Sequence, residues 1–194
     1  MKIASTSLES GVSFSFTCGV CVLAGGLSTR LGRDKARLRL GHLTMLGQIR
    51  RAAKFLGLPV RVLRRDLVPR CGPIGGVFTG LKTSPHKAEL FLACDMPFVS
   101  AAFLEDFLDG IKGRDDAVFT VSDGRAGFPF LLRTRTLALV ERQIARKEFS
   151  LQTLAQALKA RRVRIAPSRA GQLFNINTPA DLQTARRRMK RQPR

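Results

Sequence analysis

Residues 19–35 read GVCVLAGGLSTRLGRDK, and this stretch decides the fold. Residues 20–24 form a short apolar run that is long enough for a buried parallel strand. A glycine-rich turn, residues 25–32, follows this strand directly. Because ligands of open α/β sheets bind just beyond the carboxyl ends of the strands, we expect a binding site at this turn.

Similar apolar runs alternate with amphipathic segments along the rest of the chain. Residues 72–76 are expected to form a turn, and Thr178 is expected to cap a last helix with Pro179 at its first position. Alternating strands and helices predict an α/β three-layer sandwich with a mostly parallel sheet covered on both faces. We predict strands at residues 20–24, 59–63, 90–94, 117–121, 128–132 and 163–165, and helices at 45–56, 77–82, 100–107 and 150–160.

The length of 194 residues and the hydrophobic fraction of 44% suit one domain with a full-sized core. We divide the chain into a loose leader (1–15), a single domain (16–185) and a basic tail (186–194). No run of 18 apolar residues is present, so no transmembrane helix or membrane contact is expected. The N-terminal residues lack the apolar core of a secretory signal, which favours a cytoplasmic protein.

The balance of 34 basic and 14 acidic residues gives a net charge of +20 and indicates an anionic partner. This partner is either nucleic acid or a phosphorylated small molecule. The chain has no Tyr or Trp to stack on bases, so we expect no nucleic acid partner. The basic run 186–194 is interpreted as a solvated helix end or tail, and a binding arm is the alternative.

Cys18 and Cys21 have the C-x-x-C spacing of zinc and redox motifs. Cys21, however, lies inside the apolar strand run, and neither Cys71 nor Cys94 belongs to a second such pair. We therefore interpret all four as reduced cysteines in or near the core.

The glycine-rich turn has the composition of a phosphate-binding loop. Glycines let the backbone approach a phosphate or a base and present its N–H groups. Arg30 and Lys35 add cations that would neutralise a polyphosphate, which a plain glycine turn leaves unexplained. The turn is no P-loop, because Gly32 is not followed by lysine, and no dinucleotide fingerprint, because Gly25 and Gly26 are adjacent.

Asp95 is the strongest candidate for a metal ligand. It ends the apolar run 91–94 and lies in the segment C-D-M-P-F, residues 94–98. A carboxylate at the tip of a buried strand, facing a phosphate loop, fits Mg²⁺, which prefers hard oxygen ligands. The alternative is that Asp95 caps the following turn. His42 and His86 lie in no motif and are expected at the surface.

These motifs together resemble a known family. The stretch L-A-G-G-x-S-x-R-x-G-x-D-K is similar to the signature loop of sugar-phosphate and cofactor nucleotidyltransferases, and its D-K-A ending resembles the molybdenum cofactor guanylyltransferase (MobA) family. The segment C-D-M-P-F matches C-D-x-P, residues 72–81 resemble G-P-L-x-G-x-x-x-x-L, and residues 175–182 resemble N-x-N-T-P-E-D-L. The resemblance implies a Rossmann-like nucleotidyltransferase fold.

The resemblance also implies roles for individual residues in a magnesium-dependent enzyme. Asp95 would bind the metal, and Asn175 and Asn177 would bind the acceptor or help to hold the metal. Two asparagines one residue apart on an extended segment point the same way, although each could instead satisfy backbone groups near the Thr178 cap. The implied catalytic residues are Arg30, Lys35 and Asp95, and the implied nucleotide-binding residues are Leu23, Ala24, Gly25, Gly26, Lys35, Asp66 and Asp95.

The implied reaction transfers GMP from GTP to Mo-molybdopterin and releases pyrophosphate. Transient contact with other molybdenum cofactor proteins is expected. Three alternatives remain: a related transferase with another nucleotide or acceptor, such as cytidylyl transfer to molybdopterin or a sugar-phosphate reaction; a non-catalytic nucleotide-binding homologue; and a basic nucleic-acid-binding module.

Overall fold

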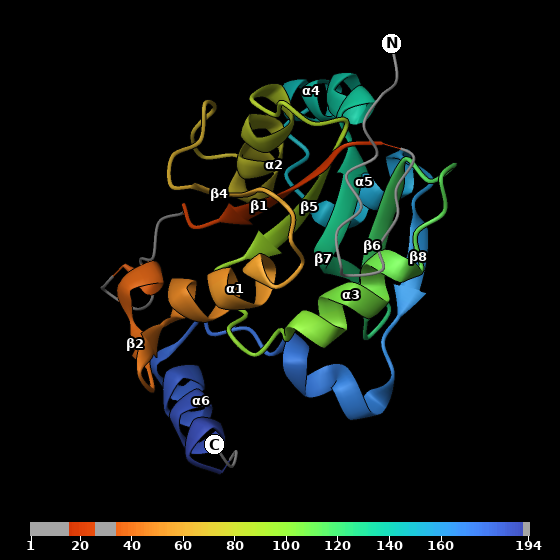
Figure 1. Cartoon of the computed structure of the whole chain (residues 1–194). Helices are drawn as coiled ribbons and strands as arrows, with labels where there is room; N and C mark the ends of the chain where they lie inside the picture. The colour runs from red at the N-terminus through yellow and green to blue at the C-terminus, as the bar shows by residue number, and fades with distance from the viewer. Residues whose placement is uncertain (1–15, 26–33, 192–194) are drawn as a thin grey trace.

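The computed structural model describes residues 16–25 and 34–191 and has one large sheet at its centre (Figure 1). The strands of this sheet are β1 (Cys18–Leu23), β4 (Val60–Leu63), β5 (Ala88–Ala93), β6 (Ala117–Ser122), β7 (Arg125–Arg133) and β8 (Arg161–Arg164). Their order is β4–β1–β5–β7–β6–β8, and β7 runs antiparallel to both of its neighbours while the other pairs are parallel. The predicted mostly parallel sheet is therefore confirmed. A separate hairpin joins β2 (Arg39–Leu40) to β3 (Leu43–Thr44).

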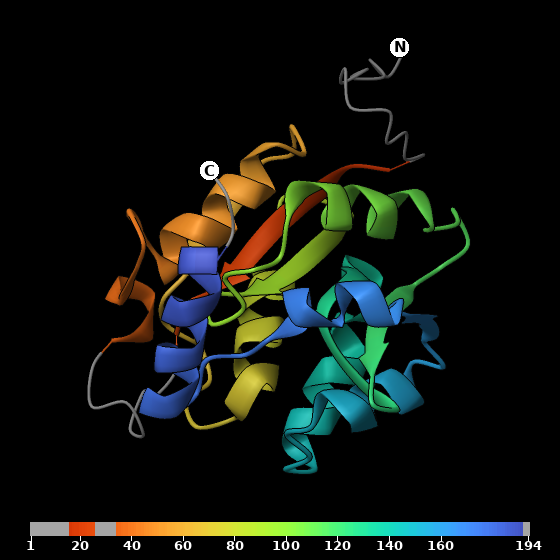
Figure 2. The same ribbon diagram turned by 90° about the horizontal axis from the view of Figure 1, so that it is seen from below.

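Helices cover both faces of the sheet, which confirms the predicted three layers (Figures 1 and 2). One face carries α1 (Met45–Lys54) and α3 (Ala101–Asp109), and the other carries α2 (Gly72–Lys82), α4 (Leu137–Ala145) and α5 (Leu151–Ala157). The last helix, α6 (Pro179–Arg191), packs beside the β2–β3 hairpin. Three short 3-10 helices complete the described chain: η1 (Lys35–Arg37), η2 (Thr134–Thr136) and η3 (Pro167–Leu173). None of the helices within these residues is long and apolar enough to cross a membrane.

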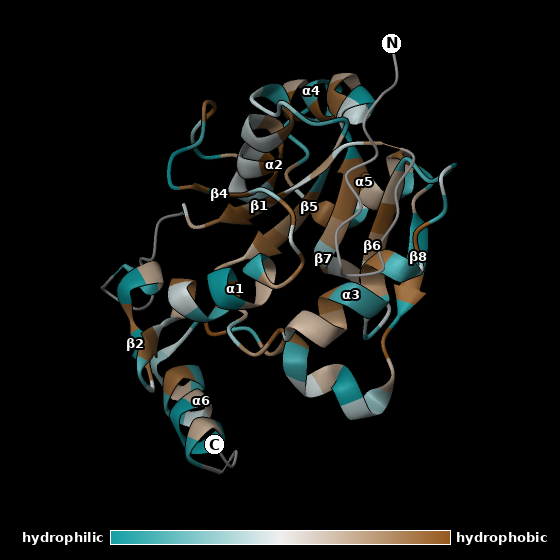
Figure 3. Cartoon of the chain, in the orientation of Figure 1, coloured by the Kyte–Doolittle hydropathy of each residue, from teal (hydrophilic) through white to brown (hydrophobic). Residues whose placement is uncertain are grey.

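The central strands are apolar on both faces because both faces are covered (Figure 3). In β1, Val20 and Val22 pack toward α1, whereas Cys21 packs toward α2. On the α2 side, the ring of Phe130 stacks between Phe91 and Phe119 at centroid distances of 5.1 and 4.5 Å. The sheet is thus a rigid platform, and its strand ends hold their positions.

All four cysteines are buried and free, as predicted for reduced core residues. Cys18 and Cys21 belong to different core clusters, because side chains three positions apart on a strand point to opposite faces. Burial raises the pKa of both thiols to about 12, so both stay protonated. The C-x-x-C spacing therefore forms neither a metal site nor a redox pair.

The predicted turn at residues 72–76 is wrong, because α2 already begins at Gly72. Its glycines serve close packing instead. A Cβ at Gly75 would lie 2.7 Å from the carbonyl oxygen of Val68, and a Cβ at Gly76 would lie 2.9 Å from Cδ1 of Leu23. Only glycine lets this helix approach the end of β1 so closely.

The sequence pattern did not predict α4 or the β2–β3 hairpin. The buried face of α4 includes Gln143, whose side chain donates to the carbonyls of Glu148 and Ser150, so its apolar stripe is interrupted. Each strand of the hairpin has two residues, which is too few to show the alternation of apolar and polar residues that predicts a strand.

The helix α6 extends through most of the basic run at the end of the chain. Thr178 caps it as predicted, since its Oγ1 accepts from the Asp181 N–H at 3.2 Å. Ala185 and Met189 pack with Leu40 of the hairpin. The boundary that we drew after residue 185 therefore falls inside α6, and the leader at residues 1–15 lies outside the described residues.

A buried ion pair ties β4 to β5 across β1. Glu89 has 0% of its side chain exposed, and its Oε1 accepts from the Arg61 guanidinium at 3.1 Å and from the Ser84 hydroxyl. Gly19 of β1 lies between these strands, and a Cβ there would be only 3.3 Å from Glu89 Oε1. The same Cβ would clash with Cδ2 of His86, so the missing side chain of Gly19 leaves room for the His86 ring as well as for the pair.

We expect Glu89→Gln to lower the free energy of unfolding by about 2 kcal/mol, because it leaves the largely buried Arg61 charge without its partner. Urea unfolding measures this loss. The matched control is Glu141→Gln, which removes an ion pair between half-exposed side chains at 3.6 Å and should cost less than about 0.5 kcal/mol. Equal losses in the two variants would contradict a special role for the buried pair.

Candidate functional site

Gly25, the first residue of the glycine turn, and Asp95 emerge from the same edge of the sheet. β1 and β5 are parallel neighbours, and their last paired residues are Leu23 and Ala93. Gly25 and Asp95 each follow two residues later. The backbone N–H of Cys94 also donates to the carbonyl of Leu23 at 3.1 Å, which joins the two strand ends.

Lys35 links this edge to a distant part of the chain. Its Nζ lies 3.4 Å from Oδ2 of Asp95 and donates to Oδ1 of Asn177 at 2.7 Å. The side chains of Lys35 and Asp95 are 18% and 20% exposed, so the contact is largely shielded from water. The structure thus brings three predicted site residues together from three separate segments.

The local sequence Asp34-Lys35-Ala36 explains how Lys35 is held. Asp34 caps η1, since its Oδ1 accepts from the Ala36 N–H at 2.9 Å. Ala36 is 2% exposed and belongs to the core cluster under α1. The Asp34 cap therefore fixes the backbone before Lys35, and the buried Ala36 fixes the backbone after it. The side chain of Lys35 then reaches Asp95.

Asp95 carries a buried oxygen that the described residues do not satisfy. Its Oδ2 faces Lys35, but its Oδ1 is buried and has no hydrogen-bond partner among them. Burial raises the pKa of Asp95, while the positive charge of Lys35 and its hydrogen bond act in the opposite direction. A buried acceptor without a partner is costly, and a cation is the kind of ligand that such an oxygen fits. The turn-cap alternative requires a bond from Asp95 to a following backbone N–H, and the described residues contain none.

The segment that carries both asparagines is tied to the end of β5. The backbone N–H of Ile176 donates to the carbonyl of Asp95 at 2.9 Å, and the Ile176 side chain is fully buried. Asn177 reaches Lys35, whereas Asn175 is exposed and makes no hydrogen bond with the other described site residues. Only one of the two predicted asparagines therefore joins the cluster.

Asp66 lies further along the same edge, beyond the end of β4. A Cβ at Gly75 would be 3.1 Å from Oδ2 of Asp66, and a Cβ at Gly76 would be 3.5 Å from its Oδ1, so the carboxylate lies against the first turns of α2. Burial raises the pKa of Asp66. Because the strand order is β4–β1–β5, the edge carries Asp66, Gly25 and Asp95 in that order.

Two predicted residues, Gly26 and Arg30, lie outside the described residues. By contrast, Leu23 ends β1 at this edge, and the N–H of the next residue, Ala24, donates to the carbonyl of Leu63 at 2.8 Å. Within residues 16–25 and 34–191, no cluster of three or more His, Cys, Asp or Glu side chains could hold a metal by itself.

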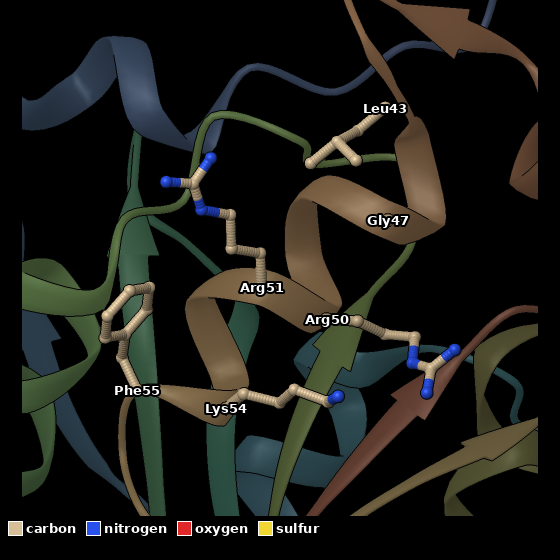
Figure 4. Close-up of a pocket in the computed structure, with 6 residues that line it drawn as sticks. All are labelled: Leu43, Gly47, Arg50, Arg51, Lys54 and Phe55. Atoms are coloured by element: carbon tan, nitrogen blue, oxygen red, sulfur yellow. The ribbon is translucent and has the colours of Figure 1, made fainter.

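A separate groove of about 580 Å³ lies on the outer surface of α1 (Figure 4). Its lining combines apolar and cationic side chains and contains no carboxylate and none of the predicted site residues. We therefore do not assign the reaction to it. The lining residues are Leu43, Gly47, Arg50, Arg51, Lys54 and Phe55.

Our reading of the sequence missed Asp181, which supports the cluster from α6. Its Oδ2 accepts from the backbone N–H groups of Asn177 at 2.9 Å and Thr178 at 2.8 Å, and these bonds lower the pKa of Asp181. The T-x-x-D spacing at residues 178–181 is a capping-box pattern and could have identified this contact.

Known proteins with similar sequences and structures identify the family of this chain. The model of the MobA-like NTP transferase domain matches residues 48–165. A protein of Opitutus terrae named "Probable molybdenum cofactor guanylyltransferase" is 32% identical, and the alignment covers 86% of this chain and 94% of that protein. The molybdenum cofactor guanylyltransferase of Pseudomonas putida is 30% identical over 86% of this chain and 96% of its own length. The crystal structure of molybdopterin-guanine dinucleotide biosynthesis protein A from Archaeoglobus fulgidus has a similar fold, with a TM-score of 0.67, 22% identity, and coverage of 90% of this chain and 100% of that one.

Proposed function

Because this chain belongs to the MobA-like NTP transferase family, we propose that it transfers GMP from GTP to Mo-molybdopterin and releases pyrophosphate. The names of its relatives support guanylyl transfer over other nucleotides. The observation that carries the proposal is the meeting of Lys35, Asp95 and Asn177 at the carboxyl edge of the sheet. A reaction that consumes GTP suits the cytoplasm.

GTP is proposed to lie along this edge, from Asp66 to Asp95. The guanine base and ribose would lie on the backbone of residues 23–26, with the base toward Asp66. The triphosphate would then extend toward Lys35, and Arg30 would contact it from the glycine turn. The order of these groups along the sheet supports this orientation.

The residues at the edge fit Mg²⁺. The ion usually binds proteins through one or two carboxylates and completes its shell with phosphate oxygens and water. Asp95 would hold it through Oδ1, the buried oxygen without a partner among the described residues. When bound, Mg²⁺ supplies positive charge to the phosphate oxygens. Lys35 would stay beside Oδ2 of Asp95 and on Asn177, and its ammonium group would face the phosphates from there.

The chain contributes position and charge to the reaction. A phosphate oxygen of molybdopterin attacks the α-phosphorus of GTP, the bond from the α-phosphorus to its bridging oxygen breaks, and pyrophosphate leaves. The nucleophile is already an anion at neutral pH, so no general base is required. Lys35 and Arg30 would stabilise the charge that gathers on the α-phosphate and the leaving group, and Asn175 and Asn177 would orient the acceptor.

Product formation with four nucleotides tests this proposal. The protein is incubated with Mg²⁺, Mo-molybdopterin and GTP, CTP, ATP or UTP, and dinucleotide and pyrophosphate are quantified. We expect product with GTP only. Product with CTP would reassign the protein to cytidylyl transfer, and nucleotide binding without single-turnover pyrophosphate release would make it a non-catalytic homologue. Strong salt-dependent binding to any duplex would instead support the nucleic-acid-binding alternative.

Asp66 is the residue proposed to select guanine. Its carboxylate can accept from the N–H groups at N1 and N2 of guanine, which cytosine lacks. We therefore expect Asp66→Ala to lower kcat/KM for GTP by about 10- to 100-fold, the value of hydrogen bonds to a charged group. The loss for CTP should be much smaller. Asp109→Ala, which changes an exposed acid at the end of α3, serves as the control. Equal losses with GTP and CTP would remove Asp66 from the base site.

A further inference from the structure

We propose that Asp181 is a positioning residue that holds Lys35 in place through Asn177. Only the kinetic test of this inference rests on the proposed function. Asp181 lies in the first turn of α6 and has no hydrogen bond to Lys35 or Asp95 within the described residues. Its hydrogen bonds therefore act on Lys35 through the segment that it holds, whereas its charge also attracts Lys35 directly; Asp181→Asn separates the two effects.

The hydrogen bonds form a continuous path from α6 to the site. Oδ2 of Asp181 accepts from the N–H of Asn177 at 2.9 Å, and Oδ1 of Asn177 accepts from Nζ of Lys35 at 2.7 Å. The first bond fixes the backbone of Asn177, and the second uses the side chain that this backbone carries. Lys35 in turn lies 3.4 Å from Oδ2 of Asp95.

The bond to Asn177 goes beyond ordinary helix capping. In a capping box, the acid at the third helical position accepts from the N–H of the cap residue, and the cap hydroxyl accepts in return. Asp181 and Thr178 make both of these bonds, at 2.8 and 3.2 Å. The additional bond to Asn177 lies one residue outside the cap, on the strand-like segment that enters the site.

The other end of this segment is also fixed, which leaves Asn177 between two anchors. Ile176 is fully buried and donates its N–H to the carbonyl of Asp95 at 2.9 Å. On the far side, α6 is held by the packing of Ala185 and Met189 against the hairpin. Losing the Asp181 anchor would therefore shift Asn177 without unfolding the segment, and a shift of about 1 Å at a catalytic group can cost on the order of 100-fold in rate.

Two variants separate positioning from capping. Asp181→Ala removes the bonds to Asn177 and Thr178, whereas Thr178→Ala removes the return bond of the same cap and leaves the bond to Asn177. Both should lower thermal stability. We expect Asp181→Ala alone to lower kcat, by about tenfold, with KM for GTP changed less than about twofold, because the charge of Lys35 remains but is misplaced. Asp181→Asn keeps an acceptor oxygen without the charge and should restore most of the rate.

A double-mutant cycle tests the route through Asn177. If Asp181 acts through Asn177, then Asp181→Ala should cause no further loss in the Asn177→Ala background, because coupled residues are not additive. Additive losses would overturn the proposed path, as would equal kcat values for Asp181→Ala and Thr178→Ala.

Proton–nitrogen NMR of the lysine ammonium groups tests the positioning without any reaction. The Lys35 signal is identified by its loss in Lys35→Arg. We expect the hydrogen-bonded signal of wild type in Thr178→Ala and Asp181→Asn and its loss or displacement in Asp181→Ala. An unchanged signal in Asp181→Ala would overturn the inference. If wild type makes no product but the NMR result holds, the proposed function fails while the positioning role stands.

Discussion

Asp95→Ala is expected to abolish turnover, with a loss of about 10⁴-fold in kcat/KM, because it removes the carboxylate that faces Lys35 and with it the proposed hold on Mg²⁺. Pyrophosphate release measures the loss. Nucleotide binding without metal should change little, since Asp95 is not proposed to contact the base. Normal turnover of this variant with Mg²⁺ and GTP would refute the metal assignment.

The stability of a second variant, Asp95→Asn, serves as the control for Asp95→Ala. Burial raises the folded pKa of Asp95 above its ordinary value of 3.8, so the folded protein holds this proton at pH values where the unfolded chain has lost it. The free energy of unfolding contributed by Asp95 therefore falls as pH rises through that window. Asp95→Asn removes this fall while it keeps an acceptor for Lys35. We expect its stability to change less with pH than that of wild type, and we expect it to be inactive. A thermal unfolding series across pH checks the sign.

Lys35→Ala should have the second largest effect, a loss of about 10³-fold in kcat/KM for GTP, because a fixed cation at the developing phosphate charge is removed from a site shielded from water. Lys35→Arg should recover only part of the rate, since the guanidinium is planar and larger and does not fit between Asp95 and Asn177 as an ammonium does.

Lys87→Ala is the matched control for charge. This exposed lysine lies just before β5, at the opposite end of the strand from Asp95. With a net charge of +20, the loss of one remote cation should change kcat/KM by less than about twofold. If both lysine variants lost activity equally, overall attraction of the anionic substrates would explain the data, and the specific role of Lys35 would be wrong.

The sequence predicted those parts of the fold in which a local pattern is typical of a single kind of structure. The apolar runs of β1 and β5 are buried on both faces, so they could hardly be surface strands. The position of Asp95 then followed, because parallel neighbours end at the same edge. Thr178 was predicted as a cap from the proline that follows it.

Other parts were misread because one residue type serves two purposes. Gly75 and Gly76 suggested a turn, but they lie inside α2, where the absence of Cβ lets the helix approach Val68 and Leu23. The edge strand β8 was predicted at 163–165 but spans 161–164, because its first residues are arginines, whose charges protect an open edge and hide the start of the strand.

Contacts between distant segments were beyond a local reading. The bond from Lys35 to Asn177 spans 142 positions, so spacing alone could not reveal it. Asn175 and Asn177 looked equivalent on an extended segment, yet Lys35 donates to Asn177. Tertiary anchoring distinguishes the two residues.

A crystal structure with a non-hydrolysable GTP analogue and Mn²⁺ tests the central claim most directly, because the anomalous signal of Mn²⁺ locates the metal without any assumption. We predict the metal on Asp95, the phosphates within hydrogen-bond distance of Lys35 and the guanine toward Asp66. Nucleotide bound in the α1 groove beside Arg50 and Phe55, with no metal at Asp95, would contradict the account.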